Sequence, residues 1–113
     1  MSAWHLPARR SKYRAIRSTV NGITFASKRE AARFAELMLL QKAGEIGGIE
    51  LQPVFAIVAL NGEVVGKYTA DFRYVRAGAL VIEDVKSPAS LTEAYRLRKK
   101  IVEASYGIRI LET

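Results

Sequence analysis

The sequence contains no cysteine, so it can form neither a disulfide nor a thiolate-bound metal site. It has a single histidine, which argues against a zinc site built from several imidazoles. A bound metal would therefore need oxygen ligands, which select magnesium, manganese or calcium. No apolar run approaches the roughly 18 residues that cross a bilayer, and no apolar signal-peptide segment is present. We therefore expect a cytoplasmic protein without membrane association.

Length and composition favour one folded domain. The chain has 113 residues, of which 50% are hydrophobic, enough for a single packed core. We interpret residues 1–12 as a flexible basic leader and residues 13–113 as the domain.

Acidic residues are absent before Glu30, whereas basic residues are frequent there. The seven basic residues before Glu30 account for the whole net charge of +7, and they are Arg9, Arg10, Lys12, Arg14, Arg17, Lys28 and Arg29. A basic arm on a neutral body suits a polyanion, most simply nucleic acid. The alternative is a solvated tail that aids solubility.

Local patterns predict a hairpin and a helix in the first part of the chain. Asn21-Gly22 between two runs of β-formers predicts a type I′ hairpin turn. Ser27 and Glu30 form a capping-box pattern, and Gly44 can end the helix that they begin. The expected apolar stripe of this helix, residues 27–44, is Ala31, Phe34, Ala35, Met38 and Leu39.

A three-stranded meander is predicted next, over residues 49–60, 64–75 and 79–86, with a turn at Asn61-Gly62. Alternation in the second strand places one group of residues on one face, as core: Tyr68, Ala70, Phe72 and Tyr74. Thr69, Asp71 and Arg73 face the other way. The third strand is apolar, which is typical of the centre of a sheet.

The chain then continues with a second helix at residues 91–106 and a final strand at residues 108–111. Ser87 or Ser90 is the expected cap of this helix, and Gly107 its end. Its expected apolar stripe is Ala94, Leu97, Ile101, Val102 and Ser105. The element order predicts an α/β fold, in which helices flank a mixed sheet behind an N-terminal hairpin.

The chain has only two aspartates, Asp71 and Asp84, and both lie near the ends of neighbouring predicted strands. Asp84 and Lys86 are two positions apart on one strand, so their side chains leave the same face. Ile82 precedes them on that face. A carboxylate and an ammonium at the end of a central strand are costly to bury without a purpose.

Such a group suits phosphodiester hydrolysis, which needs a water activated by a metal and positive charge where the phosphorane forms. Asp71 and Asp84 can hold Mg²⁺ or Mn²⁺, and the backbone carbonyl of Val85 can add another oxygen ligand. Lys86 can position the attacking water or help to deprotonate it.

The runs Tyr68-Thr69-Ala70-Asp71-Phe72 and Val81-Ile82-Glu83-Asp84-Val85-Lys86-Ser87 resemble the PD-(D/E)xK nuclease signature. With residues 21–23, 25–31 and 51–53, the wider pattern is similar to small phage and prophage proteins of the restriction-endonuclease-like superfamily. The resemblance covers about residues 20–111. One departure is Ala70, which stands where the signature has proline.

The resemblance implies a restriction-endonuclease-like fold and a metal-dependent nuclease. Carried over, Asp71 and Asp84 would bind magnesium, and Lys86 would serve the attacking water. A glutamate on the first helix often completes such a metal site, and Glu30 matches it.

Each candidate also has a simpler interpretation. Asp71 can be a surface carboxylate or the cross-strand partner of an arginine. Asp84 and Lys86 can form a surface ion pair worth at most about 1 kcal/mol. Glu30 is fully explained by the capping box.

Two further residues are weaker candidates for a supporting role around the metal. Glu83 faces away from Asp84 and is expected to pair with a basic neighbour. Gln52 can approach the cleft from its own strand. The basic residues of the second helix either contact DNA phosphates or form a solvated face. The candidate DNA-binding residues are Arg9, Arg10, Lys12, Arg14, Arg17, Arg96, Lys99 and Lys100.

We therefore predict a magnesium-dependent DNA endonuclease, with branched or Holliday-junction DNA in phage recombination as a candidate substrate. One site per subunit implies a homodimer if both strands are cut. No small-molecule cofactor is expected, and the location would be the cytoplasm of a phage-infected or lysogenic bacterium. The alternatives are a non-catalytic DNA-binding module and a phage assembly or interaction protein.

Overall fold

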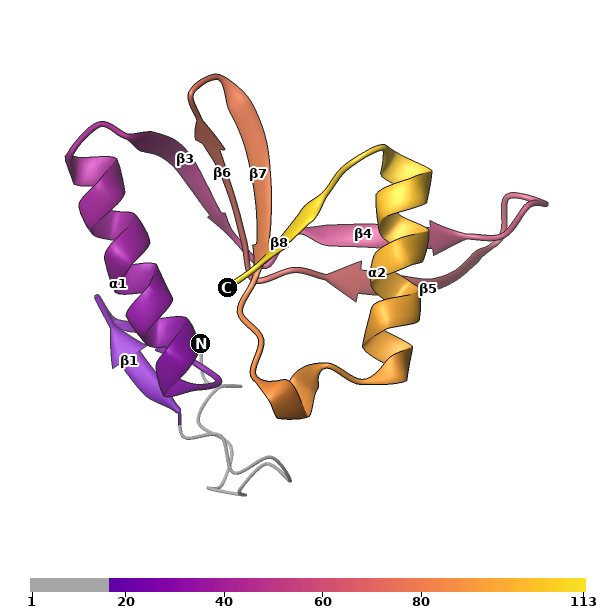
Figure 1. Cartoon of the computed structure of the whole chain (residues 1–113), viewed down its shortest axis with the longest axis horizontal. Helices are drawn as coiled ribbons and strands as arrows, with labels where there is room; N and C mark the ends of the chain where they lie inside the picture. The colour runs from indigo at the N-terminus through magenta and orange to yellow at the C-terminus, as the bar shows by residue number, and fades with distance from the viewer. Residues whose placement is uncertain (1–16) are drawn as a thin grey trace. The chain divides into compact units, whose positions relative to one another are not determined.

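A computed structural model describes residues 17–113, so the predicted leader at residues 1–12 lies outside the described part of the chain. The chain divides into two units, of which the first ends at Leu39 and the second runs from Leu40 to Thr113. Both helices and strands occur in the second unit, and its main sheet is mixed (Figure 1). The α/β class predicted from the sequence is thus confirmed.

The first unit contains a hairpin, β1 (Ser18–Val20) and β2 (Ile23–Phe25), followed by most of α1 (Lys28–Lys42). Asn21 and Gly22 adopt φ angles of 51° and 77°, the left-handed pair that a type I′ turn needs. The hydroxyl oxygen of Ser27 accepts a hydrogen bond from the Glu30 N–H at 3.1 Å. Both the hairpin turn and the Ser27 cap are confirmed.

The buried face of α1 differs from the predicted stripe. Ala31, Phe34 and Leu37 are buried, whereas Leu39, which was assigned to the stripe, is 68% exposed. The Phe34 ring lies against Phe25, with 5.0 Å between the ring centroids. The buried face of α1 therefore runs through Ala31, Phe34 and Leu37, whereas the predicted stripe continued toward Leu39.

The second unit is built on a four-stranded sheet in the order β3-β6-β7-β8. Its strands are β3 (Ile46–Leu51), β6 (Phe72–Arg76), β7 (Ala79–Asp84) and β8 (Ile110–Glu112). The β3–β6 and β6–β7 pairs are antiparallel, and β7–β8 is parallel. The interior position predicted for β7 is therefore confirmed.

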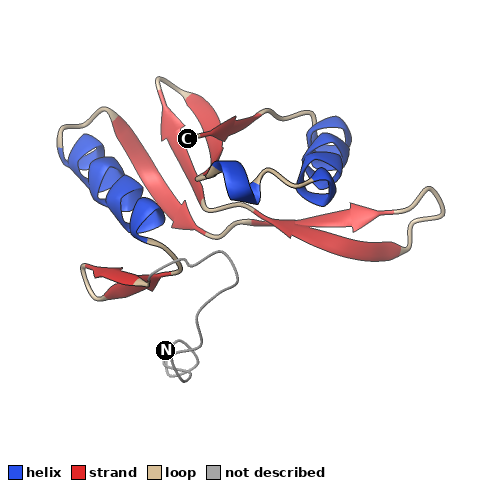
Figure 2. Cartoon of the chain, turned by 60° about the horizontal axis from the view of Figure 1, so that its bottom comes forward, coloured by secondary structure: helices blue, strands red, loops and turns tan. Residues whose placement is uncertain are grey.

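Two of the predicted strands are each divided in two. Residues 49–60 supply the end of β3 and all of β4 (Val54–Val58), and residues 64–75 supply β5 (Val64–Thr69) and most of β6. β4 and β5 form a separate two-stranded sheet (Figure 2). Gln52 has a left-handed φ of 52°, and Pro53 has no N–H to donate, so β3 cannot continue into β4.

The bend between β5 and β6 also corrects the predicted strand face. The Ala70 N–H donates to the Pro53 carbonyl at 3.0 Å, and the Gln52 N–H donates to the Asp71 carbonyl at 2.9 Å, so the two bends are joined. Beyond this bend the pleat does not continue in phase. Tyr68 belongs to one buried cluster, whereas Tyr74 bonds to Glu83 on the opposite face of β7. The prediction that Tyr68, Ala70, Phe72 and Tyr74 share one strand face is wrong.

The second helix, α2 (Glu93–Tyr106), begins later than predicted. Its N-cap is Thr92, whose Oγ1 accepts a hydrogen bond from the Tyr95 N–H. Ser87 instead caps a short 3₁₀ turn, η2 (Pro88–Ser90), and Leu91 has a non-helical ψ of 60° that separates the turn from the helix. The choice of Ser87 or Ser90 as the helix cap is wrong, whereas the end at Gly107, with φ 65°, is confirmed.

The buried face of α2 is also rotated from the expected stripe. Tyr95 and Val102 are buried, whereas Ala94, Ser105 and Leu97, which is 60% exposed, face solvent. α2 lies beside the β4–β5 hairpin (Figure 1). The face of α2 that lies toward this hairpin therefore carries Tyr95, whose large ring packs beside that of Tyr68 on β5.

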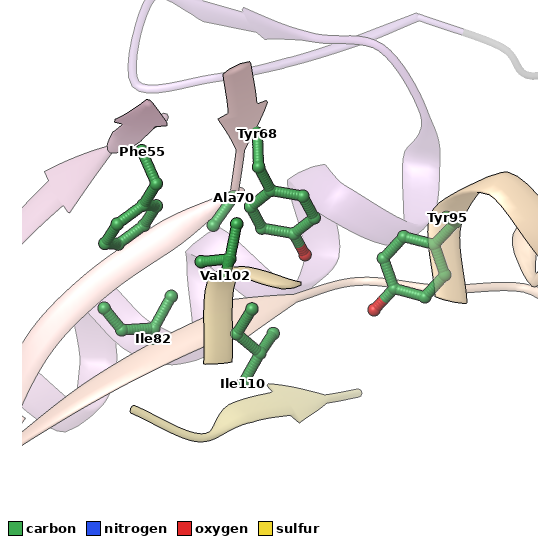
Figure 3. Close-up of a cluster of buried hydrophobic side chains, with 7 residues drawn as sticks. All are labelled: Phe55, Tyr68, Ala70, Ile82, Tyr95, Val102 and Ile110. Carbon is green, nitrogen blue, oxygen red and sulfur yellow. The ribbon is translucent and has the colours of Figure 1, made fainter. Parts of the chain in front are cut away.

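The core of the second unit joins α2 to both sheets (Figure 3). Its buried members are Phe55, Tyr68, Ala70, Ile82, Tyr95, Val102 and Ile110. Burial of one such large side chain contributes about 1.5–3 kcal/mol. Two of these residues, Tyr68 and Tyr95, carry hydroxyls that reach carboxylates at the ends of β7 and β8. In residues 17–113, no helix has both the length and the apolar character to cross a membrane.

Candidate active site

Asp71 and Asp84 lie opposite each other at one end of the sheet. Asp71 directly precedes β6 and Asp84 ends β7, and the antiparallel register of these strands makes the two residues neighbours. The Asp71 N–H donates to Asp84 Oδ1 at 3.0 Å, and the Val85 N–H donates to Asp71 Oδ2 at 2.8 Å. Each carboxylate therefore bonds to the backbone of the other strand. Residues that face each other in an antiparallel pair share a face, so both carboxylates leave the same side.

Burial of these carboxylates disfavours their charge. Asp84 is only 2% exposed and Asp71 is half-buried. Desolvation raises the pKa of Asp84 to about 6, and opposing contributions come from Lys86 and from the Asp71 N–H. Desolvation also raises the pKa of Asp71, against the hydrogen bond from Val85 and the charge of Lys86. Positive charge placed between the two groups would favour their ionised forms.

Tyr68 is a contact of Asp84 that the sequence did not reveal. The Tyr68 hydroxyl donates to Asp84 Oδ2, while its ring lies in the core cluster. The predicted core role is correct for the ring. Its hydroxyl is a buried donor to Asp84, the candidate metal ligand. The hydroxyl reaches Asp84 because the chain bends at Ala70, and the sequence does not predict this bend.

Lys86 lies just after β7, and its N–H donates to the Thr113 carbonyl at 3.0 Å. Its ammonium lies over the ring of Tyr95, with 4.1 Å between Nζ and the ring centroid. Among the described residues, Lys86 forms no ion pair with a carboxylate. The simple surface ion pair between Asp84 and Lys86 is therefore not formed, although the charge of Lys86 acts on both aspartates.

A third carboxylate, Glu112, lies beside Asp84 on the parallel strand β8. Its Oε2 accepts hydrogen bonds from the Tyr95 hydroxyl at 2.8 Å and from Lys99 Nζ at 2.9 Å. These two donors, with Lys99 the stronger, lower the pKa of Glu112. Burial and the bond to Glu112 raise the pKa of Tyr95 well above its usual range. Glu112 was not predicted, since only the tertiary pairing of β7 with β8 brings it here.

Glu83, a predicted supporting residue, is fully buried on the opposite face of β7. Its carboxylate accepts hydrogen bonds from the Tyr74 hydroxyl at 2.7 Å and from the Thr113 hydroxyl at 3.0 Å. The predicted orientation away from Asp84 thus agrees with the strand pleat. Each of the two carboxylate oxygens of Glu83 thus accepts a hydrogen bond from a hydroxyl group.

The other predicted residues are placed as follows. Gln52 is exposed and touches the site through its backbone, whose N–H bonds to the Asp71 carbonyl. The carbonyl oxygen of Val85 accepts no hydrogen bond from any described residue.

Glu30 lies in the first turn of α1, in the first unit, where its N–H bonds to Ser27. Asp71 forms no ion pair with an arginine among residues 17–113, so the alternative of a cross-strand arginine partner is not seen.

The predicted DNA-binding residues fall into two groups. Arg9, Arg10, Lys12 and Arg14 lie outside the described residues, and Arg17 is exposed at their edge. Arg96 and Lys100 are exposed on α2, whereas Lys99 is ion-paired with Glu112. Of the α2 cations, Lys99 is thus tied to the site, and its neighbours face solvent.

The described residues contain no cluster of three or more acidic or histidine side chains arranged to hold a metal ion. What meets at the end of β7 is a pair of carboxylates, Asp71 and Asp84. Asp71 Oδ1 accepts no hydrogen bond from the described chain, and the Val85 carbonyl next to Asp84 is equally uncommitted. These oxygens are the hard ligands that magnesium and manganese prefer, so the donor set fits such an ion completed by water.

The model of one protein family matches residues 10–111, and that family is described as "Protein of unknown function (DUF1064)". The chain belongs to this family. The range matched by the DUF1064 family includes Asp71, Asp84 and Lys86 and extends through most of β8. No curated protein and no solved structure matches the chain.

Proposed function

We propose that this DUF1064 protein is a metal-dependent endodeoxyribonuclease with a restriction-endonuclease-like fold. One observation carries the proposal: Asp71 and Asp84 are neighbours on one face at the end of the interior strand β7. Lys86 follows directly, as the resemblance to the PD-(D/E)xK signature requires. The mixed sheet that positions them supports the fold assignment.

In this proposal, Asp71, Asp84 and the Val85 carbonyl hold Mg²⁺ or Mn²⁺. The carboxylates are desolvated and their pKa values are raised, so a dication would relieve an unfavourable charge. When bound, the ion supplies charge neutralisation and lowers the pKa of a coordinated water. Glu30, in the first turn of α1, stays a prediction from the sequence.

Lys86 provides the positive charge next to the metal ligands. Its ammonium orients the attacking water and offsets the negative charge that develops on the phosphorane. Positioning and electrostatic stabilisation of this kind supply most of the catalysis in phosphoryl transfer. The Tyr68 hydroxyl holds Asp84 Oδ2, which leaves the other lone pairs of this carboxylate for the ion.

The DNA backbone would contact the exposed basic residues. Arg96 and Lys100, which are exposed on α2, offer positive charge to the DNA phosphates. The basic residues before Glu30 offer further positive charge. Branched or junction DNA is the proposed substrate. One site per chain implies that a homodimer cuts both strands.

Plasmid cleavage tests this proposal. Supercoiled DNA is incubated with the protein and Mg²⁺ or Mn²⁺, and nicked and linear products are quantified. The variants Asp84→Asn and Lys86→Met should lose cleavage, whereas Glu63→Gln, at an exposed carboxylate in the β4–β5 turn, should cleave normally. A panel of linear, flapped and four-way substrates then tests the preference for branched DNA.

A non-catalytic DNA-binding module is the second candidate. It is favoured by two observations: the described residues contain no group of three or more acidic or histidine side chains that could hold a metal ion, and backbone hydrogen bonds stabilise both Asp71 and Asp84. Such a module would bind DNA without cutting it, with the same affinity in the Asp84→Asn variant. Absence of DNA binding at low salt would contradict both candidates and favour an interaction protein.

A further inference from the structure

The amine of Lys86 has a defined position although the side chain is long and flexible. Its Nζ lies 4.1 Å from the centroid of the Tyr95 ring, above the ring face. A cation at this place is attracted by the negative face of the aromatic ring. Since Lys86 has no ion-pair partner among the described residues, this contact is the interaction that locates its ammonium.

Tyr95 is itself held at both ends. Its N–H bonds to the Thr92 hydroxyl oxygen at the start of α2, at 3.1 Å. Its own hydroxyl donates to Glu112 Oε2 at 2.8 Å, and Lys99 Nζ binds the same oxygen at 2.9 Å. The ring also lies beside that of Tyr68, with 6.3 Å between the centroids (Figure 3). The surface under Lys86 is therefore fixed to α2, β8 and the core.

We propose that Tyr95 is a positioning residue, whose ring holds the Lys86 ammonium beside the Asp71–Asp84 pair and whose hydroxyl is anchored on Glu112. The inference rests on the proposed nuclease function, in which Lys86 must meet the attacking water. An unrestrained lysine would spend much of its time in other rotamers. The ring restricts it without neutralising its charge, as a carboxylate partner would.

A purely structural role for Tyr95 is the competing explanation, because its ring is also part of the core. Tyr106 offers a matched control on the same helix. Its ring packs edge-on against Phe55 at 5.2 Å, and its hydroxyl donates to the Ala56 carbonyl at 2.7 Å. Like Tyr95, it has an aromatic neighbour and a hydroxyl that donates a hydrogen bond, although it is 44% exposed and Tyr95 is buried. The Lys86 ammonium lies over the ring of Tyr95 and not over that of Tyr106.

The kinetic experiment compares Tyr95→Leu, Tyr95→Phe and Tyr106→Leu in the full chain. We expect Tyr95→Leu to lower kcat for plasmid nicking by on the order of tenfold, with little change in KM for DNA. Tyr95→Phe keeps the ring and should retain most of the turnover. Tyr106→Leu should leave kcat within about twofold of the wild type after any loss of folded protein is taken into account.

Fluorinated phenylalanines at position 95 cover the case in which Tyr95→Leu does not fold. Trifluoro-phenylalanine keeps the shape of phenylalanine but weakens the negative ring face, so kcat should fall below that of Tyr95→Phe. Equal kcat values in these two proteins would overturn the proposal. So would a Tyr95→Leu enzyme with wild-type kcat, or losses in Tyr95→Leu and Tyr106→Leu that simply follow their thermal stability.

A second measurement does not depend on nuclease activity. Lysine amines are labelled by reductive ¹³C-methylation, and the Lys86 signal is identified by its loss in Lys86→Arg. Stacking over Tyr95 should shift this signal upfield, and the shift should persist in Tyr95→Phe and Tyr106→Leu but vanish in Tyr95→Leu. An unshifted Lys86 signal in the wild type overturns the positioning role. If the shift is present while the wild type cuts no DNA with either metal, the nuclease proposal fails and the Tyr95–Lys86 contact stands.

Discussion

The last two residues of β7, Glu83 and Asp84, are adjacent and both buried, yet their surroundings differ. Glu83 accepts hydrogen bonds from two hydroxyls, those of Tyr74 and Thr113, on one face of the sheet. Asp84 lies on the other face, opposite a second carboxylate and close to the charge of Lys86. The difference teaches that burial by itself does not identify a reactive carboxylate. A stronger indication of a reactive carboxylate is a second carboxylate beside it, together with oxygen atoms that accept no hydrogen bond.

The sharpest way to break this comparison is to neutralise each carboxylate without changing its size. We expect Asp84→Asn to lower the rate of metal-dependent cleavage by about 10³-fold or more, because a ligand of the ion is lost. Glu83→Gln should cleave at close to the wild-type rate per folded molecule. Single-turnover nicking with fluorescent DNA measures both, and equal losses in the two variants would contradict the distinction.

Asp84 should matter more than Glu83 for cleavage, but Glu83 should matter more than Asp84 for stability. Glu83→Ala leaves the buried Tyr74 hydroxyl and the half-buried Thr113 hydroxyl without this partner and opens a cavity, so the free energy of unfolding should fall by about 3 kcal/mol. Asp84→Ala should cost less at pH 7, since it also removes a carboxylate that is ionised at the expense of desolvation. Urea denaturation of the metal-free proteins checks this prediction.

The pH dependence of stability should carry the signature of Asp84. Its pKa is about 6 in the folded protein, against 3.8 for an unperturbed group. The folded state therefore binds more protons than the unfolded state between these values, so stability should fall as the pH rises from about 4 to 6. The change for this group is at most about 3 kcal/mol. Asp84→Asn should flatten the curve, and Mg²⁺ should raise the melting temperature at pH 7 in the wild type but not in this variant.

The smallest expected effects come from the two tyrosines that donate to these carboxylates. Tyr68→Phe removes the hydroxyl that holds Asp84 Oδ2 and should weaken Mg²⁺ activation by on the order of tenfold. Tyr74→Phe removes a donor to Glu83 and should lower stability by about 1 kcal/mol without changing the Mg²⁺ dependence. Titration of nicking rate against metal concentration separates the two variants. A matching shift in Tyr74→Phe would show that the faces of β7 are coupled.

The sequence predicted that Asp71 and Asp84 lie close together, but it did not predict which other residues surround them. Asp71 and Asp84 could be placed together because β6 and β7 are joined by a tight turn, in which Ala77 and Gly78 take φ angles of 51° and 77°. The roles of Tyr68 and Glu112 could not be predicted. Tyr68 reaches Asp84 only through the bend at Ala70, and Glu112 does so only through a parallel pairing with a strand far along the chain.

Local spacing thus determined the turns at Asn21-Gly22, the helix end at Gly107 and the position of Asp84 at the end of an interior strand. These features depend on the φ angles that a few residues accept and on the two-residue period of a strand. Tertiary packing decided where the long strands bend, which face α2 buries and which ring lies under Lys86. Those outcomes depend on partners distant in the sequence, whose side chains compete for the same space in the core.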